Sequence, residues 1–93
     1  MKQQATIEVV FLTKADGGRS NPIDAEKYGC PVLVGEQGLD CRFVLSGRTR
    51  FEPGVRHKIG IAFLNPSLAQ ELLSEGQPIQ LWEGKVIAQG IVK

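Results

Sequence analysis

Asp16-Gly17-Gly18-Arg19, followed by Pro22, closes a strongly apolar first segment and opens a loop that the rest of the chain must cover. Two adjacent glycines let the backbone adopt positive φ without a penalty from a Cβ atom. The guanidinium of Arg19 beside such a turn either returns to nearby carbonyls or reaches outward to a carboxylate or phosphate. Both interpretations need a rigid turn. The first, in which Arg19 ties the loop to the body of the protein, is the more common use of turn glycines.

Segments on both sides of this turn have the patterns of β-strands. The run before it, residues 7–12, is apolar and rich in β-branched and aromatic residues. Residues 55–63 show the cleanest alternation in the chain and predict a half-buried strand with Val55, His57, Ile59, Ile61 and Phe63 on its apolar face. The full set of predicted strands is 7–12, 31–34, 41–45, 55–63, 78–82 and 86–92.

The predicted hairpin across residues 35–38 has two alternative registers. If Gly35 lies opposite Asp40, Cys30 and Cys41 are four positions out of step, about 13 Å along a strand, which is too far for a disulfide. A two-residue turn at Gly35-Glu36 instead places Cys30 opposite Cys41. Two cysteines do not make a disulfide framework, so we expect reduced and buried thiols.

The remaining signals indicate loops and one short helix. Residues 20–27 are polar and broken by Pro22, which is typical of a loop. Asn65 and Pro66 form a helix start, and leucines follow at helical spacing before Gly76. Six short strands without a βαβ rhythm predict an all-β protein, either a closed antiparallel barrel or a sandwich. We expect a single domain over residues 1–93, with residues 1–5 as an N-terminal tail.

Composition excludes several classes of protein. The chain of 93 residues has 42% hydrophobic and 23% charged residues, with a formal net charge of +1. Such a balance is typical of a globular protein and argues against a polybasic nucleic-acid binder. No apolar run approaches the roughly 18 residues of a membrane span, and no signal peptide follows the first methionine, so a cytoplasmic location is expected.

The order of these features resembles the C-terminal β-barrel of elongation factor Tu and its eukaryotic counterpart, elongation factor 1-alpha. The matching features extend over nearly the whole chain, from an apolar strand and Gly17-Gly18-Arg19 to a closing Glu83-Gly84 and Gly90. Between them lie Pro22, Tyr28, Pro31, Pro53-Gly54, Pro66 and Glu75-Gly76. The resemblance implies a six-stranded antiparallel Greek-key barrel, present here without the GTPase domain. No phosphate-binding Gly-x-x-x-x-Gly-Lys-Ser/Thr motif occurs, so we expect no GTP binding.

The same resemblance implies contacts with other macromolecules. In the family this barrel contacts the backbone of aminoacyl-tRNA, the GTPase domain and an exchange factor. Here Trp82 replaces an arginine of the family pattern, the second glycine of the last turn is missing before Lys85, and Val32 replaces a glutamine. These departures remove hydrogen-bond donors from positions where a phosphate backbone would lie, and they argue against tRNA binding.

Two sets of residues are therefore candidates for a binding surface. The leading hypothesis is a non-catalytic module for a protein partner, related to translation, that is contacted by Arg19, Trp82, Glu83 and Lys85; tryptophan is enriched among interface anchors. Alternatively, Trp82 folds back over Val86 or Val10. The second hypothesis is RNA binding through the basic residues Arg48, Arg50, Arg56 and Lys58, against which stands the simpler interpretation of a solvated charged face.

No pattern of catalytic residues is visible. His57 is the only histidine, and a lone histidine on an apolar strand face is typical of a core residue rather than a general base. The cysteines are not spaced from His57 as zinc ligands, and no serine or cysteine has a histidine and carboxylate at suitable spacing. We therefore expect no enzymatic activity, no metal and no cofactor.

Overall fold

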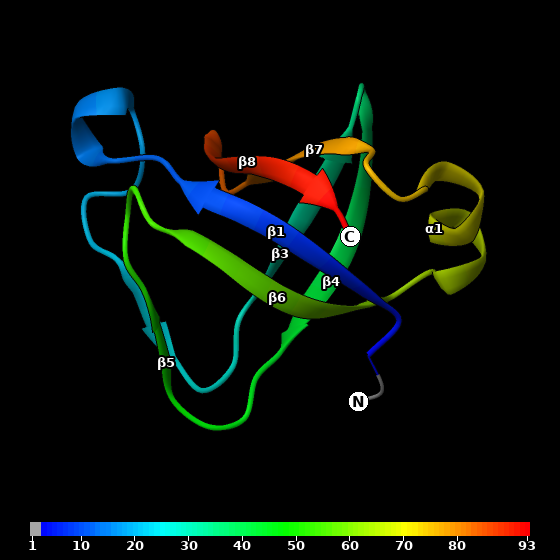
Figure 1. Cartoon of the computed structure of the whole chain (residues 1–93), viewed down its shortest axis with the longest axis horizontal. Coiled ribbons are helices and arrows are strands. Elements are labelled where there is room, and N and C mark those ends of the chain that lie inside the picture. Colours follow the sequence, from blue (N-terminus) through cyan, green and yellow to red (C-terminus); the bar gives the residue numbers. More distant parts are fainter. Residues whose placement is uncertain (1–2) are drawn as a thin grey trace.

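Six strands of the computed structural model, which describes residues 3–93, close into an antiparallel barrel (Figure 1). The strands are β1 (Ala5–Phe11), β3 (Gly29–Val34), β4 (Gln37–Val44), β6 (Arg56–Phe63), β7 (Pro78–Trp82) and β8 (Val86–Val92). Their order around the barrel is β1-β6-β4-β3-β7-β8, and β8 pairs with β1 to complete the circle. β3, β4 and β6 follow one another along the chain and pair side by side in the barrel, and β1 lies on the far side of β6. This arrangement of four strands is a Greek key. The predicted all-β barrel is confirmed.

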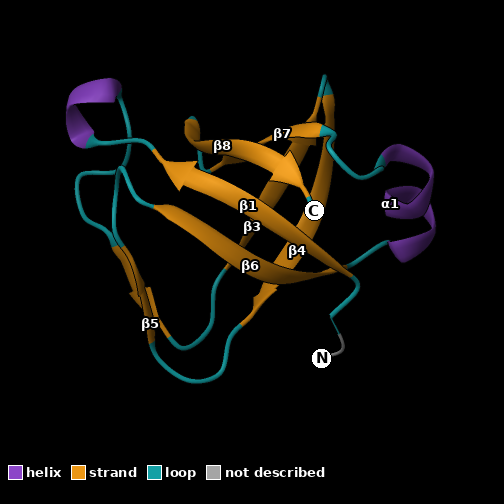
Figure 2. Cartoon of the chain, viewed as in Figure 1, coloured by secondary structure: helices purple, strands orange, loops and turns teal. Residues whose placement is uncertain are grey.

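Two further strands form an arm at one side of the barrel (Figure 2). These are β2 (Ile23–Ala25) and β5 (Thr49–Phe51), which pair with each other. The prediction that residues 20–27 are only a loop is therefore wrong. The arm forms because Ile23 and Phe51 bury their side chains, and the ring of Phe51 lies 5.5 Å from that of Phe11 in the barrel. Three-residue strands leave too short an alternation to be recognised in the sequence.

Within residues 3–93 there is one α-helix, α1 (Pro66–Leu72), which follows β6 as predicted. Asn65 caps it, since its side-chain oxygen accepts a hydrogen bond from the Leu68 amide at 3.3 Å, and Pro66 occupies the first turn. A 3₁₀ turn, η1 (Lys14–Asp16), precedes the glycine pair. Leu68, Leu72 and Leu73 pack against the core cluster, which explains their spacing.

The barrel interior is apolar and follows the predicted alternation. Every buried side chain among the described residues is hydrophobic, and the only other buried residue in residues 3–93 is Gly18. On β6 the alternation holds for Ile59, Ile61 and Phe63, but Val55 lies before the strand and half of its surface is exposed, so its predicted place on the apolar face is wrong. At the other end of the chain, β1 begins at Ala5, inside the expected tail. The Gln4 amide also donates to the Ile61 carbonyl at 2.8 Å, while residues 1–2 lie outside the described part.

The hairpin between β3 and β4 has the shorter of the two predicted turns. Val34 pairs with Gln37 around Gly35-Glu36, and Cys30 lies directly opposite Cys41. The register with Gly35 opposite Asp40 is wrong, because a positive φ of 60° at Gly35 allows the tight turn. Both cysteines are nevertheless free and buried, and the Cys41 thiol donates to the Cys30 carbonyl at 3.2 Å.

The two glycines that follow η1 have different roles. Gly17 has a φ of 90° and ends the 3₁₀ turn in the left-handed conformation, as expected. Gly18 does not have a positive φ. A Cβ atom on Gly18 would lie only 2.0 Å from the Leu12 carbonyl oxygen, so glycine is needed there for close packing of the loop against the end of β1.

Candidate binding surface

Arg19 ties its loop to the β7–β8 hairpin through Glu83. The Arg19 Nε lies 3.0 Å from one carboxylate oxygen of Glu83, and the Tyr28 hydroxyl donates a hydrogen bond to the other. The guanidinium carbon of Arg19 also lies 5.9 Å from the centre of the Tyr28 ring, within the range of a cation–π contact. Burial of Tyr28, followed by its hydrogen bond to Glu83, raises the pKa of the phenol above its ordinary value. The hydroxyl therefore remains a donor at neutral pH.

Lys85 makes a second link between the same two segments. Its Nζ donates to the Gly18 carbonyl at 2.9 Å. Three of the four candidate residues for protein binding, Arg19, Glu83 and Lys85, thus lie together at one end of the barrel, where they hold the loop and the hairpin in place. This geometry matches the interpretation in which Arg19 ties the loop to the barrel, because its guanidinium is engaged within the molecule.

Trp82, the fourth candidate, points away from the core at the end of β7. Ile79 and Leu81 are buried on the inner face, so Pro78, Gln80 and Trp82 alternate onto the outer one. A register irregularity between Leu81 and Trp82 places Trp82 opposite Val86, one of the two residues named in the fold-back alternative. The side chain still keeps 42% of its surface exposed.

The strands beside Trp82 extend this outer surface without adding a charge. On β3, Cys30 and Val32 are buried, so Pro31 and Leu33 face outward; on β8, Gln89 and Ile91 do the same, and Ile91 is 37% exposed. We name this surface the uncharged face. It consists of Pro31, Leu33, Pro78, Gln80, Trp82, Gln89 and Ile91.

A hollow opens in the uncharged face where two strands diverge. β3 and β7 share only two residue pairs, Val32 with Leu81 and Leu33 with Gln80. Beyond these pairs, a hollow of about 430 Å³ lies between the tip of the β3–β4 hairpin and the start of β7. Leu33, Pro78 and Gln80 are among its lining residues, so the uncharged face is concave at this point as well as partly apolar.

Charged residues border the uncharged face on two sides. Asp40 of β4 pairs with Pro31, and Glu8 of β1 pairs with Ile91. Interfaces between proteins commonly have such an arrangement, with charge depleted in the centre and a polar rim around it. Trp82 was predicted from the sequence as an outward-facing residue, but the rest of this face was not. The alternation in residues 78–82 was a signal for Pro78 and Gln80, but the position of β3 beside β7 depends on the tertiary fold.

The four candidate residues for RNA binding fall into two groups. Arg48 and Arg50 lie at the β2–β5 arm, where Asp24 is 2.9 Å from Arg48 and 3.9 Å from Arg50, and Glu52 also pairs with Arg50. Two carboxylates thus neutralise two arginines. Arg56 and Lys58 lie instead on the outer surface of β6, beside Glu8.

The two buried thiols are held in their neutral forms. Burial raises the pKa of Cys30 to about 12 and that of Cys41 to about 11. A protonated thiol is a poor nucleophile, so these side chains are suited to packing. The ring of His57 lies 5.2 Å from that of Phe51 and 6.0 Å from that of Phe11, and its Nε2 is 3.2 Å from the Glu52 carbonyl oxygen. One side of the His57 ring thus packs against core aromatics, but the residue is only partly buried and does not belong to the core predicted for it.

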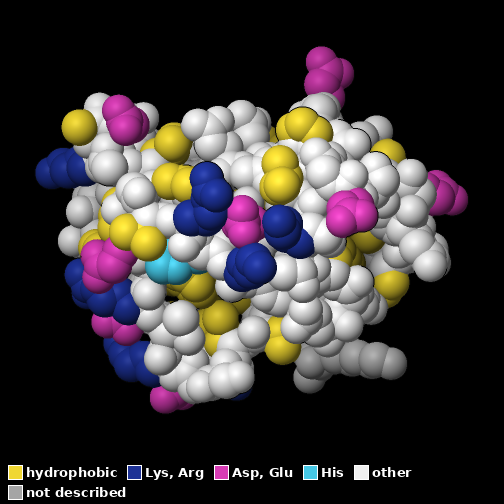
Figure 3. Space-filling view, viewed as in Figure 1, with side chains coloured by type: hydrophobic (Ala, Val, Ile, Leu, Met, Phe, Trp, Pro, Cys, Tyr) yellow, Lys and Arg dark blue, Asp and Glu magenta, His cyan; other side chains and the backbone are white. Residues whose placement is uncertain are grey.

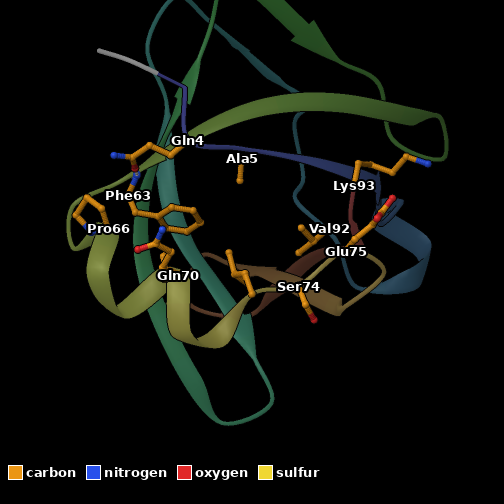
Figure 4. Close-up of a pocket in the computed structure, with 11 residues that line it drawn as sticks. Gln4, Ala5, Phe63, Pro66, Gln70, Ser74, Glu75, Val92 and Lys93 are labelled. Carbon is orange, nitrogen blue, oxygen red and sulfur yellow. Dashed lines mark hydrogen bonds between the residues drawn. The ribbon is translucent and has the colours of Figure 1, made fainter.

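A second cavity, of about 500 Å³, lies between α1 and the end of the barrel (Figure 4). Gln4 and Gln70 lie toward one side of it, and Glu75 and Lys93 toward the other. Its floor includes Phe63 and Val92, which are buried. Glu75 and Lys93 are the only charged residues that line it, and no group of three or more potential metal ligands occurs within residues 3–93.

No family model matches the chain, and no curated protein sequence matches it either. Over the part of the chain that the structure describes, no helix has the length and apolar character needed to cross a membrane.

Proposed function

We propose that this barrel is a non-catalytic binding module that docks a protein partner on the uncharged face. The observation that supports the proposal is an exposed tryptophan at the end of a three-strand surface without charges, bordered by charged residues. The resemblance to the C-terminal barrel of elongation factor Tu, a cytoplasmic location and a partner from the translation apparatus remain parts of this proposal.

The contribution expected from Trp82 follows from its exposed area. A tryptophan side chain buries about 150–250 Å² when fully covered, so the exposed 42% is roughly 60–105 Å². At about 25 cal/mol per Å² its burial by a partner stabilises the complex by roughly 1.5–2.5 kcal/mol. This corresponds to an affinity change of about tenfold or more.

The test is quantitative capture of partners from a cell extract on the immobilised barrel. We expect Trp82→Ser to lower the yield of specific partners about tenfold. Leu64→Ser is the matched control, because Leu64 is a large apolar residue that is 56% exposed but lies outside the uncharged face. The proposal is wrong if both variants capture the same proteins as the unmodified chain. Capture that disappears after nuclease treatment would favour the RNA hypothesis instead.

A further inference from the structure

Three basic side chains surround one carboxylate on the outer surface of β1, β6 and the end of β8. Glu8 lies 3.6 Å from Arg56 and 4.0 Å from Lys93, and it is the register partner of Lys58 across β1 and β6. We name this group the Glu8 cluster. Figure 3 shows Lys and Arg side chains gathered around a single acidic one over these strands.

The Glu8 cluster carries more positive charge than the protein as a whole. Three cations and one carboxylate give +2 in side-chain charge, whereas the formal net charge of the chain is +1. The other side chains together therefore sum to −1. None of the ion pairs found among residues 3–93 includes Lys58, and the Arg56 side chain is 72% exposed. The excess charge is thus available to an approaching molecule.

The β2–β5 arm shows that this excess is a local property. Arg48 and Arg50 are also exposed, but Asp24 and Glu52 balance them within the arm. The two groups contain similar cations and differ in how many carboxylates accompany them. The arm therefore supplies an internal control for the effect of surface charge.

The cluster adjoins the uncharged face through Ile91. Glu8 pairs directly with Ile91, which is 37% exposed and belongs to the uncharged face. A partner that covers Ile91 also comes within reach of the Glu8 cluster. Electrostatic complementarity of this kind raises association rates and fixes orientation more than it adds affinity.

The composition of the cluster favours carboxylates over a phosphate backbone. Nucleic-acid affinity comes from many phosphate contacts, commonly about 6–10 in a specific complex, and the cluster offers three cations. Glu8 leaves the cluster with a net side-chain charge of only +2, which is small for a site that has to follow a nucleic-acid backbone. One or two acidic side chains of a protein partner match a charge of that size.

We infer that the partner of the uncharged face is a protein with an acidic segment, whose carboxylates bind Arg56, Lys58 and Lys93 while an apolar side chain packs against Ile91. The inference rests on the proposed function, because the same partner covers both surfaces. It assigns Arg56 and Lys58 to protein binding, and it leaves Arg48 and Arg50 outside the interface.

Two synthetic peptides test the inference. One contains four glutamates around a central Leu-Phe pair, and the other has glutamine in place of each glutamate. In fluorescence anisotropy at low salt, we expect the acidic peptide to bind about tenfold more tightly than its glutamine version. The double variant Arg56→Glu/Lys58→Glu should abolish this preference, and about 0.5 M salt should reduce it strongly. The matched control, Arg48→Glu/Arg50→Glu, should keep it.

Trp82→Ser separates the inference from the proposed function. It should weaken both peptides equally, because it removes apolar area and no charge. If Trp82→Ser has no effect on either peptide, the proposed function fails. If Trp82→Ser weakens binding but the unmodified barrel binds the two peptides equally, only the acidic-partner inference fails. The same holds if Arg56→Glu/Lys58→Glu and Arg48→Glu/Arg50→Glu lose the same affinity for the acidic peptide. Tighter binding of mixed tRNA than of the acidic peptide would also overturn it.

Discussion

Gly90 lies where β8 approaches β1 so closely that a side chain cannot be accommodated. A Cβ atom added to Gly90 would lie 1.9 Å from the Glu8 carbonyl oxygen and 2.7 Å from the Val9 Cα. Real Cβ atoms essentially never come within 3.0 Å of another heavy atom, so the first contact is more than 1 Å too short. Both neighbours belong to the backbone of β1, so no side-chain rotation relieves the overlap. Gly90→Ala must instead move β8 away from the strand that closes the barrel.

The expected loss of stability from Gly90→Ala is about 3 kcal/mol or more. Overpacking by a methyl group usually costs about 1–3 kcal/mol. Moving β8 away from β1 also strains the hydrogen bonds between these two strands, which share five residue pairs. Each such hydrogen bond is worth about 0.5–1.5 kcal/mol. The entropic benefit of replacing glycine by alanine offsets only about 0.4–1 kcal/mol. A domain of this size has a total stability of about 5–14 kcal/mol, so the loss is a large fraction of it.

Urea denaturation measures the effect, with the fluorescence of Trp82, the only tryptophan, and circular dichroism as two probes. Gly38→Ala is the matched control, because Gly38 also lies in a strand but its added Cβ would meet only Leu33 Cδ2 at 3.7 Å. We expect the control to change the free energy of unfolding by less than about 1 kcal/mol. Equal midpoints for the two variants would refute the argument that close backbone approach sets the requirement for glycine.

Three further predictions concern the loop, its ion pair and the thiols. Gly18→Ala should lower the melting temperature, because the new Cβ would lie 2.0 Å from a carbonyl oxygen; a thermal scan showing no loss of about 1–3 kcal/mol would contradict this. A double-mutant cycle with Arg19→Ala and Glu83→Gln should give a coupling energy below about 1 kcal/mol, because the two side chains are 32% and 41% exposed and solvent screens the ion pair. A larger coupling energy would contradict this and show that the ion pair dominates the stability of the loop. The folded-state pKa values of Cys30 and Cys41, about 12 and 11, lie above the ordinary thiol value of 9.0. Stability should therefore be constant below pH 9 and fall by up to about 1.4 kcal/mol per thiol and pH unit above it; urea titrations at pH 8 and pH 10 check the sign, with Cys30→Ala as the comparison.

The barrel was predictable because its strands carry strong local signals. Alternation in residues 55–63 and apolar runs elsewhere identified all six barrel strands, and Asn65-Pro66 identified the start of the helix. The errors lie where local patterns are short or equally compatible with two structures. β2 and β5 have three residues each, and the hairpin after Val34 allowed two turns, of which a positive φ at Gly35 selects the tighter one.

The candidate surface was only partly predictable because it consists of residues from strands that are not consecutive in the chain. Trp82 was identified as a single outward residue, but Pro31 and Leu33 of the same face come from a strand about fifty positions earlier. Strand alternation shows which residues face outward; it does not show which outward faces adjoin, because that depends on the order β3-β7-β8 around the barrel. The same reason explains why the basic candidates, close together between residues 48 and 58, separate into a neutralised arm and a positively charged cluster. Whether a charge is compensated depends on the strand beside it: Asp24 reaches Arg48 through the pairing of β2 with β5, and Lys93 reaches Glu8 through the pairing of β8 with β1.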